Sequence, residues 1–117
     1  MQFLIRAMDG TDDRALDRRV AARGAHVARS DELIEAGSVL YSVALLDERD
    51  RMIGSVMIVE FPDREAVDAW LQTEPYVTGG VWQRIDVEPC RVGPSFVGLH
   101  ENPRAPDARA RDCQSVV

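Results

Sequence analysis

The apolar positions of the chain gather in four short runs, at residues 2–8, 38–46, 52–61 and 81–87. Each run has the length of a β-strand and is followed by turn-forming residues such as Asp9-Gly10 or Pro89. Only a polar segment, 47–51, separates the second run from the third, which predicts a β-hairpin. The pattern therefore predicts four strands.

Two longer segments between these runs carry the signals of helices. Downstream of the capping residues at 11–13, only Gly24 would weaken a helix before Gly37, a residue typical of helix ends. A second helix is predicted after Asp63, a good N-cap, and Pro75 interrupts it. The resulting order β-α-β-β-α-β is the ferredoxin-like arrangement, an α+β fold with a four-stranded antiparallel sheet.

Both faces of the predicted sheet are apolar. In the third strand the two alternating sets are Met52, Gly54, Val56 and Ile58 on one side and Ile53, Ser55, Met57 and Val59 on the other. Because helices in this fold cover one sheet face, the second face needs another partner. We expect a homodimer in which two sheets pack face to face, since two-fold pairs are the commonest oligomers. The alternative is that the tail, 92–117, which we expect to be partly disordered or to pack on the dimer, folds back over this face.

One side of the first predicted helix combines an apolar stripe with two polar residues. The residues that fall within about 40° of one another at ~100° per residue are Leu16, Val20, Val27 and Ile34. This stripe predicts the core-facing side, and Arg23 lies close enough to it to need an anionic partner, an acid of this chain or a ligand. His26, three residues further on, could act as a general acid or base. The alternative is a surface Arg-His pair bonded to neighbouring acids.

A second group of candidate residues follows the second predicted helix. Pro75 suits the first position of a new helical turn, so Glu74 is expected at or next to its N-cap, with a carboxylate held in a fixed direction. Such a carboxylate could orient an imidazole. Tyr76 and Trp82 supply aromatic walls, and strict alternation puts Trp82 on the same side of the last strand as Arg84. The alternative is a capping turn with a packed aromatic residue.

Composition and charge narrow the classes of function. The 117 residues include 14 basic residues, all of them arginine, against 20 acidic ones, for a net charge of −6. Without lysine, Schiff-base, PLP-anchoring and P-loop chemistry are excluded, and the acidic balance argues against nucleic acid as a partner. No apolar run is long enough for a signal peptide or a membrane span, and Cys90 and Cys113 stand alone without metal-ligand spacing. We therefore expect a cytoplasmic chain with reduced cysteines and no metal or cofactor.

Three segments, taken together, resemble the YciI-like (YCII-related) family. Residues 23–29, Arg-Gly-Ala-His-Val-Ala-Arg, resemble its R-x-A-H-x-x-R segment, and residues 54–66 resemble its G-S…E-F-x-S-x-E-A stretch. Glu74-Pro75-Tyr76, with Gly80, resembles the diagnostic D-P-Y-x-x-x-G signature. The resemblance covers residues 1–91 in the same order, so we interpret 1–91 as the family domain.

The resemblance implies a ferredoxin-like domain that pairs into a dimeric α/β barrel. It also implies a His-Asp pair at the mouth of a pocket, which maps onto His26 and Glu74. We expect a small cofactor-independent enzyme of lyase or isomerase type, in which His26 moves a proton on a compact, anionic or phenolic substrate and Glu74 orients His26. The residues expected to bind the substrate are Arg23, Ser55, Tyr76 and Trp82.

Two departures from the family pattern bear on the site. Glu74 stands where the signature has Asp, which adds a methylene group, and Tyr41-Ser42 stands where relatives carry a small G-P-type segment and could reshape the pocket floor. If Glu74 does not reach His26, the alternative is a non-catalytic dimer that binds a metabolite or a partner protein. A tailoring enzyme of a biosynthetic pathway is a third interpretation.

Overall fold

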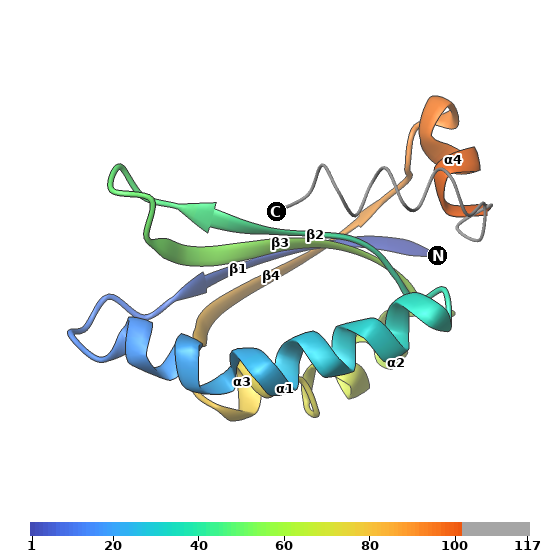
Figure 1. Ribbon diagram of the computed structural model, residues 1–117. Helices are drawn as coiled ribbons and strands as arrows, with labels where there is room; N and C mark the ends of the chain where they lie inside the picture. Colours follow the sequence, from blue (N-terminus) through green and yellow to red (C-terminus); the bar gives the residue numbers. More distant parts are fainter. Residues whose placement is uncertain (102–117) are drawn as a thin grey trace.

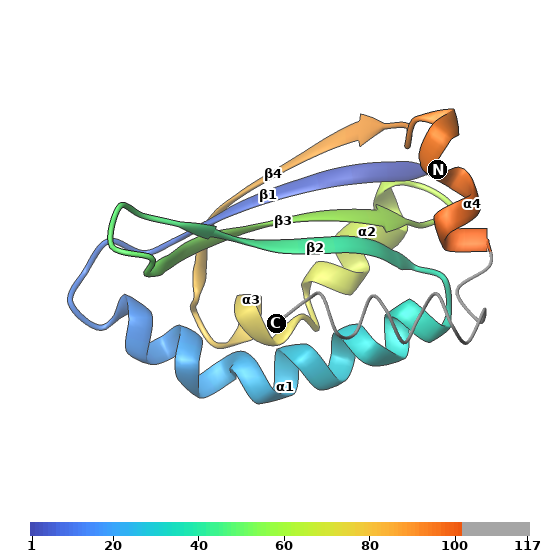
Figure 2. The ribbon, with the colours of Figure 1, turned by 45° about the horizontal axis from the view of Figure 1, so that its top comes forward.

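The computed structural model describes the backbone of residues 1–101 and the side chains of residues 1–97. Its elements in chain order are β1 (Gln2–Asp9), α1 (Ala15–Glu35), β2 (Val39–Leu46), β3 (Met52–Glu60), α2 (Arg64–Leu71), α3 (Pro75–Thr78), β4 (Trp82–Cys90) and α4 (Pro94–Glu101). The strands form one antiparallel sheet in the order β2-β3-β1-β4, with β2 and β4 at its edges (Figure 2). The predicted α+β, ferredoxin-like fold is confirmed.

The helices α1, α2 and α3 form a layer against one face of the sheet, and they leave the opposite face open (Figure 1). Between the two layers lies a core of buried side chains from strands and helices: Phe3, Ile5, Ala7, Val39, Met57, Val59, Val67, Trp70, Tyr76, Val81 and Trp82. Burial of this apolar surface is the main force that holds the helices on the sheet.

The predicted helix ends are largely confirmed. Asp63 caps α2, since its Oδ1 accepts a hydrogen bond from the Ala66 N–H at 2.9 Å. Gly37 follows α1 with φ at 78°, a backbone conformation that glycine adopts without steric cost. The start of α1 differs from the prediction, because Arg14 occupies the N-cap position and its side chain accepts no capping hydrogen bond.

The predicted core-facing stripe of the first helix is wrong. Its members are 39–60% exposed: Leu16, Val20, Val27 and Ile34. The residues of α1 that are buried against the sheet are Ala15, Arg19 and His26, with Ala22 and Leu33 packed at the edge of the core. The buried face is thus rotated by about one residue, roughly 100°, from the apolar stripe, because two polar residues point inward.

The open face of the sheet has an apolar half and a charged half. Residues that pair across strands share a face, so the apolar half, on β2 and β3, carries Tyr41, Val43, Val56 and Ile58. By the same registers the charged half, on β1 and β4, carries Arg6, Arg84, Asp86 and Glu88, together with two apolar residues of β1, Leu4 and Met8. The charged side chains are therefore confined to one half of the face, and residues 102–117 of the predicted covering tail lie outside the described residues.

Strand β4 departs from the prediction at both of its ends. It continues through Pro89 to Cys90, where the sequence predicted an end at Val87. A proline is tolerated there because β4 is an edge strand, so that the missing N–H interrupts no ladder on its outer side. At the other end, the pairing of β1 with β4 shifts register between Met8 and Asp9, which forms a β-bulge.

Candidate active site

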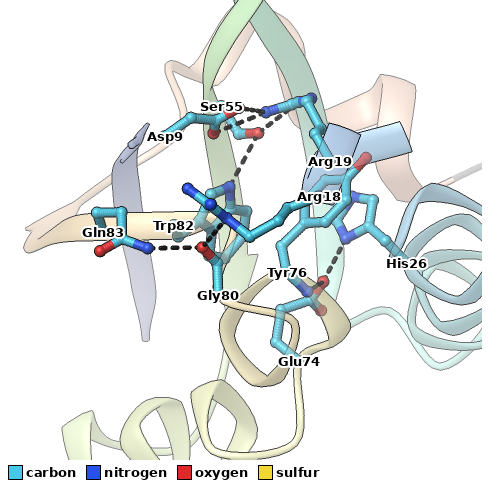
Figure 3. Close-up of polar contacts among 10 residues, drawn as sticks. All are labelled: Asp9, Arg18, Arg19, His26, Ser55, Glu74, Tyr76, Gly80, Trp82 and Gln83. Carbon is cyan, nitrogen blue, oxygen red and sulfur yellow. Dashed lines mark hydrogen bonds and ion pairs between the residues drawn. The ribbon is translucent and has the colours of Figure 1, made fainter. Parts of the chain in front are cut away.

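Polar and aromatic side chains from α1, α3 and three strands converge between the helices and the sheet (Figure 3). The buried members of this cluster are Asp9, Arg19, His26, Ser55, Glu74, Tyr76 and Trp82. Five of them were candidates from the sequence, and Asp9 and Arg19 were not. Because buried polar groups cost free energy unless they are paired, each of these residues needs an account of its partners.

The short helix α3 brings Glu74 to His26. A Cβ atom at Gly79 would lie 2.9 Å from the Pro75 carbonyl oxygen and 3.4 Å from Ala22 Cβ, so two small residues let α3 pack closely on α1. Glu74 caps α3, and its Oε1 accepts a hydrogen bond from the Tyr76 N–H at 3.4 Å. The same oxygen contacts His26 Nδ1. The added methylene of Glu74 therefore does not prevent the expected contact with His26.

The imidazole of His26 is fixed on several sides. Its ring stacks on the ring of Tyr76, with centroids 3.9 Å apart and planes inclined by 11°, and Trp82 approaches it edge-on at 6.0 Å. Glu74 is fully buried and His26 is 8% exposed. Because Nδ1 is engaged by the carboxylate, Nε2 is the nitrogen that remains for proton exchange with a ligand.

Trp82 lies on the opposite side of β4 from the one that the sequence predicted. Strict alternation groups Trp82 with Arg84, but the bulge pairs Trp82 with Asp9 while Arg84 pairs with Met8. Trp82 therefore faces the helices and is 5% exposed, and its Nε1 donates a hydrogen bond to Ser55 Oγ at 3.3 Å. The bulge thus places the Trp82 side chain among the site residues.

The sequence missed a buried ion pair between Arg19 and Asp9. Arg19 Nη1 lies 3.0 Å from both carboxylate oxygens of Asp9, Nη2 donates to Ser55 Oγ at 3.0 Å, and the guanidinium carbon is 4.8 Å from the centre of the Tyr76 ring. Burial raises the pKa of the Asp9 carboxyl, and the hydrogen bond and charge of Arg19 oppose that shift. The spacing in the sequence could have indicated Arg19 as a site residue, because Arg19 precedes His26 by two helical turns and so shares its face of the helix.

Arg23 is exposed, which contradicts its predicted position close to the buried side of the helix. Within the described residues its guanidinium has no ion pair or hydrogen bond. Burial raises the pKa of the Tyr76 phenol, and the charges of Arg19 and Arg23 partly offset this shift, so Arg23 lies near the Tyr76 side of the site. Of the two residues expected to reshape the pocket floor, Tyr41 is excluded because it pairs with Ile58 and shares its open sheet face, whereas Ser42 pairs with the buried Met57 and shares the face that the helices cover.

Three further observations bound the chemistry of the described part of the chain. Residues 1–97 contain no cluster of three or more His, Cys, Asp or Glu side chains able to hold a metal ion. No helix among the described residues is long and apolar enough to cross a membrane, and the expected cytoplasmic location stays a prediction. A cavity of about 330 Å³ is lined by Gln2, Glu60 and Arg91, among others, and includes none of the site residues.

Comparisons with known proteins place the chain among relatives of similar length. The model of the YCII-related domain matches residues 1–91. Protein YciI of Escherichia coli O6:H1 is 35% identical over 97 residues, which cover 78% of this chain and 97% of that protein. An uncharacterized protein of Haemophilus influenzae is 30% identical over the same coverage.

Among solved structures, the chain is similar to 5-chloro-2-hydroxyhydroquinone dehydrochlorinase (TftG) from Burkholderia phenoliruptrix AC1100, in its complex with 2,5-dihydroxybenzoquinone. The TM-score is 0.69 at 25% identity, over 81% of this chain and 98% of that one. The domain match, the sequence identity and the shared fold agree, and the chain belongs to the YCII-related family.

Proposed function

We propose that this protein is a small-molecule enzyme of lyase or isomerase type that works by proton transfer without a cofactor. The observation that carries the proposal is the buried contact between His26 Nδ1 and Glu74 Oε1, which leaves Nε2 of an immobilised imidazole for the substrate. The similarity to a dehydrochlorinase supports it, because loss of HCl from one molecule requires removal of a proton as chloride departs with its bonding electrons.

The other site residues fit distinct roles in this chemistry. His26 takes a proton from a compact, anionic or phenolic substrate, and Glu74 holds the imidazole in one tautomer and stabilises the imidazolium that forms. Arg23, exposed and without an ion pair in the described residues, attracts the negative group of the substrate. Tyr76 and Trp82 supply an aromatic wall of the kind that favours a flat ring.

The experiment is an assay of chloride release from 5-chloro-2-hydroxyhydroquinone and from a panel of other halogenated hydroquinones. We expect wild-type turnover on at least one member, and a loss of about 10²–10⁴-fold in kcat for His26→Gln. His100→Gln, at the other histidine of the chain, is the matched control and keeps the wild-type rate. Turnover that survives in His26→Gln would exclude the proposed role of His26, and binding without turnover across the panel would favour a non-catalytic module.

We also propose that two copies associate through the open face of the sheet, as in a dimeric α/β barrel. The apolar half of that face supports this, since Tyr41 and Val43 are 39% and 54% exposed in a single copy. Sedimentation equilibrium of the full chain tests the proposal. A monomer at concentrations of tens of micromolar would contradict it.

A further inference from the structure

The hydroxyl of Ser55 has a restricted hydrogen-bonding capacity in this fold. Its Oγ accepts one hydrogen bond from Arg19 Nη2 at 3.0 Å and another from Trp82 Nε1 at 3.3 Å. A serine hydroxyl has two lone pairs and one proton, so both acceptor positions are occupied and only the proton remains. Ser55 can therefore act toward a ligand as a donor and not as an acceptor.

Within the residues that the structure describes, the Ser55 hydroxyl donates no hydrogen bond. The carboxylate oxygens of Asp9, on the neighbouring strand, both accept from Arg19 Nη1. A second donor also makes no hydrogen bond, because Arg19 Nε is buried without a hydrogen-bond partner in the described residues. It belongs to the guanidinium whose Nη2 contacts Ser55, so the two free donors are neighbours.

The charges around these donors are balanced. Arg19 and Asp9 form an ion pair whose side chains are each 3% exposed, and Asp9 offsets most of the field of the guanidinium at a distance. Close to the ion pair, the groups that can still act on a ligand are the Arg19 Nε–H and Ser55 O–H dipoles, which are buried away from water. Such an arrangement stabilises an oxygen on which negative charge develops, because fixed dipoles need no reorganisation during the reaction.

We propose that Ser55 Oγ–H and Arg19 Nε–H together form a site for an oxyanion, which receives a phenolate, enolate or quinone oxygen of the substrate. The inference rests on the proposed function and makes it more specific: the substrate carries an oxygen that accepts two hydrogen bonds while His26 moves a proton elsewhere on the molecule. Ser55 is then a residue that determines specificity and not a nucleophile.

The test measures binding of 4-nitrophenolate to the full chain by its visible absorbance. For wild type we expect the anion to bind in preference to the neutral phenol, so that the apparent pKa of the bound probe falls. Ser55→Ala should weaken binding of the anion by roughly 10–100-fold, the range for a hydrogen bond to a charged group. Ser55→Thr keeps a hydroxyl and should stay within about threefold of wild type.

Matched controls separate this inference from a general loss of structure and from the proposed function. Ser95→Ala, at an exposed serine of α4, should bind the probe as wild type does. His26→Gln should retain binding of the probe even though turnover is lost; turnover that persists in His26→Gln would refute the proposed proton transfer without affecting the oxyanion site.

Three results would overturn the oxyanion site. These are no binding of 4-nitrophenolate by wild type at millimolar concentration, preference of wild type for the neutral phenol, and wild-type affinity in a folded Ser55→Ala variant. The first two are measured on wild type alone, so they decide the matter even if Ser55→Ala does not fold.

Discussion

The buried ion pair of Arg19 and Asp9 predicts an asymmetry between its two partners when each is removed. In Asp9→Asn the guanidinium of Arg19 loses its counter-charge and cannot shed its own, because arginine stays protonated at any pH at which the protein folds. In Arg19→Met the carboxyl of Asp9 loses its partner but can take up a proton and become neutral. The two variants should therefore respond differently to pH.

The expected magnitudes follow from the geometry. Both side chains are 3% exposed, so removal of one partner falls in the range of buried pairs, about 3–5 kcal/mol. We expect about 3 kcal/mol for Asp9→Asn, since the amide oxygen still accepts a hydrogen bond. For Arg19→Met we expect a cost in the same range at pH 7, and loss of the guanidinium raises the pKa of Asp9 further above its already raised value.

The sign of the pH dependence follows from linkage. Because the folded Arg19→Met variant has the higher pKa at Asp9, it gains stability relative to wild type as the pH falls through that pKa. Its cost should therefore be smaller at pH 5 than at pH 7, while the cost of Asp9→Asn changes little.

Urea unfolding at pH 7 and pH 5, at several protein concentrations to account for any association, measures all of these quantities. Two results would refute this reasoning: equal pH dependence of stability in the two variants, or a loss of less than about 1 kcal/mol of unfolding free energy in both. Either would mean that removal of one partner does not leave an unpaired buried charge.

Three other expectations can be measured independently. Burial raises the pKa of the Tyr76 phenol above its ordinary value of 10.0. In Tyr41→Phe, where Tyr76 is the remaining tyrosine, ultraviolet absorbance should show ionisation above pH 10, and the stability of the fold should decrease as the pH rises from about 10 through that pKa. An ionisation midpoint below pH 10 would contradict the raised pKa. Glu74→Gln should lower kcat by about 10²–10⁴-fold with little change in KM. Glu74→Asp should be more active than Glu74→Gln only if the shorter carboxylate still reaches His26. A change in KM alone for Glu74→Gln would argue against an orienting role of Glu74. Val43→Asp, at a position 54% exposed, should change the stability of one copy by less than about 0.5 kcal/mol yet shift sedimentation toward monomer; an unchanged mass would exclude this face as the interface.

Local signals in the sequence were sufficient to predict the order of the elements. Turn residues, capping residues and apolar runs act within a few positions, which is why Asp63, Gly37 and Pro75 delimit helices where they were expected to. The contact of His26 with Glu74, between residues 48 apart, was predicted only through the resemblance to the family, because no periodicity relates positions on separate elements.

The features that the sequence did not predict depend on tertiary context. The bulge between Met8 and Asp9 reverses the side of β4 on which Trp82 lies, and alternation within a single strand contains no information on its partner's register. The prediction of which face of α1 is buried was wrong for a related reason. Apolar periodicity assigns a helix face by its hydrophobic residues, whereas the buried face here contains Arg19 and His26, whose burial depends on Asp9 and Glu74 from other elements.

This inversion of α1 is itself an argument for function. A helix that buried Leu16, Val20, Val27 and Ile34 would gain apolar contact area, yet this one leaves them 39–60% exposed and buries an arginine and a histidine instead. A buried ion pair is on average no more stabilising than a well-packed apolar replacement, so stability alone does not favour this face. What the buried face provides is a rigid set of charged and polar groups, held in place by partners on β1, β3 and α3. Local sequence pattern and fold disagree along α1 at Arg19 and His26, and a disagreement of this kind is typical of groups retained for function, which supports the proposed roles of these two residues.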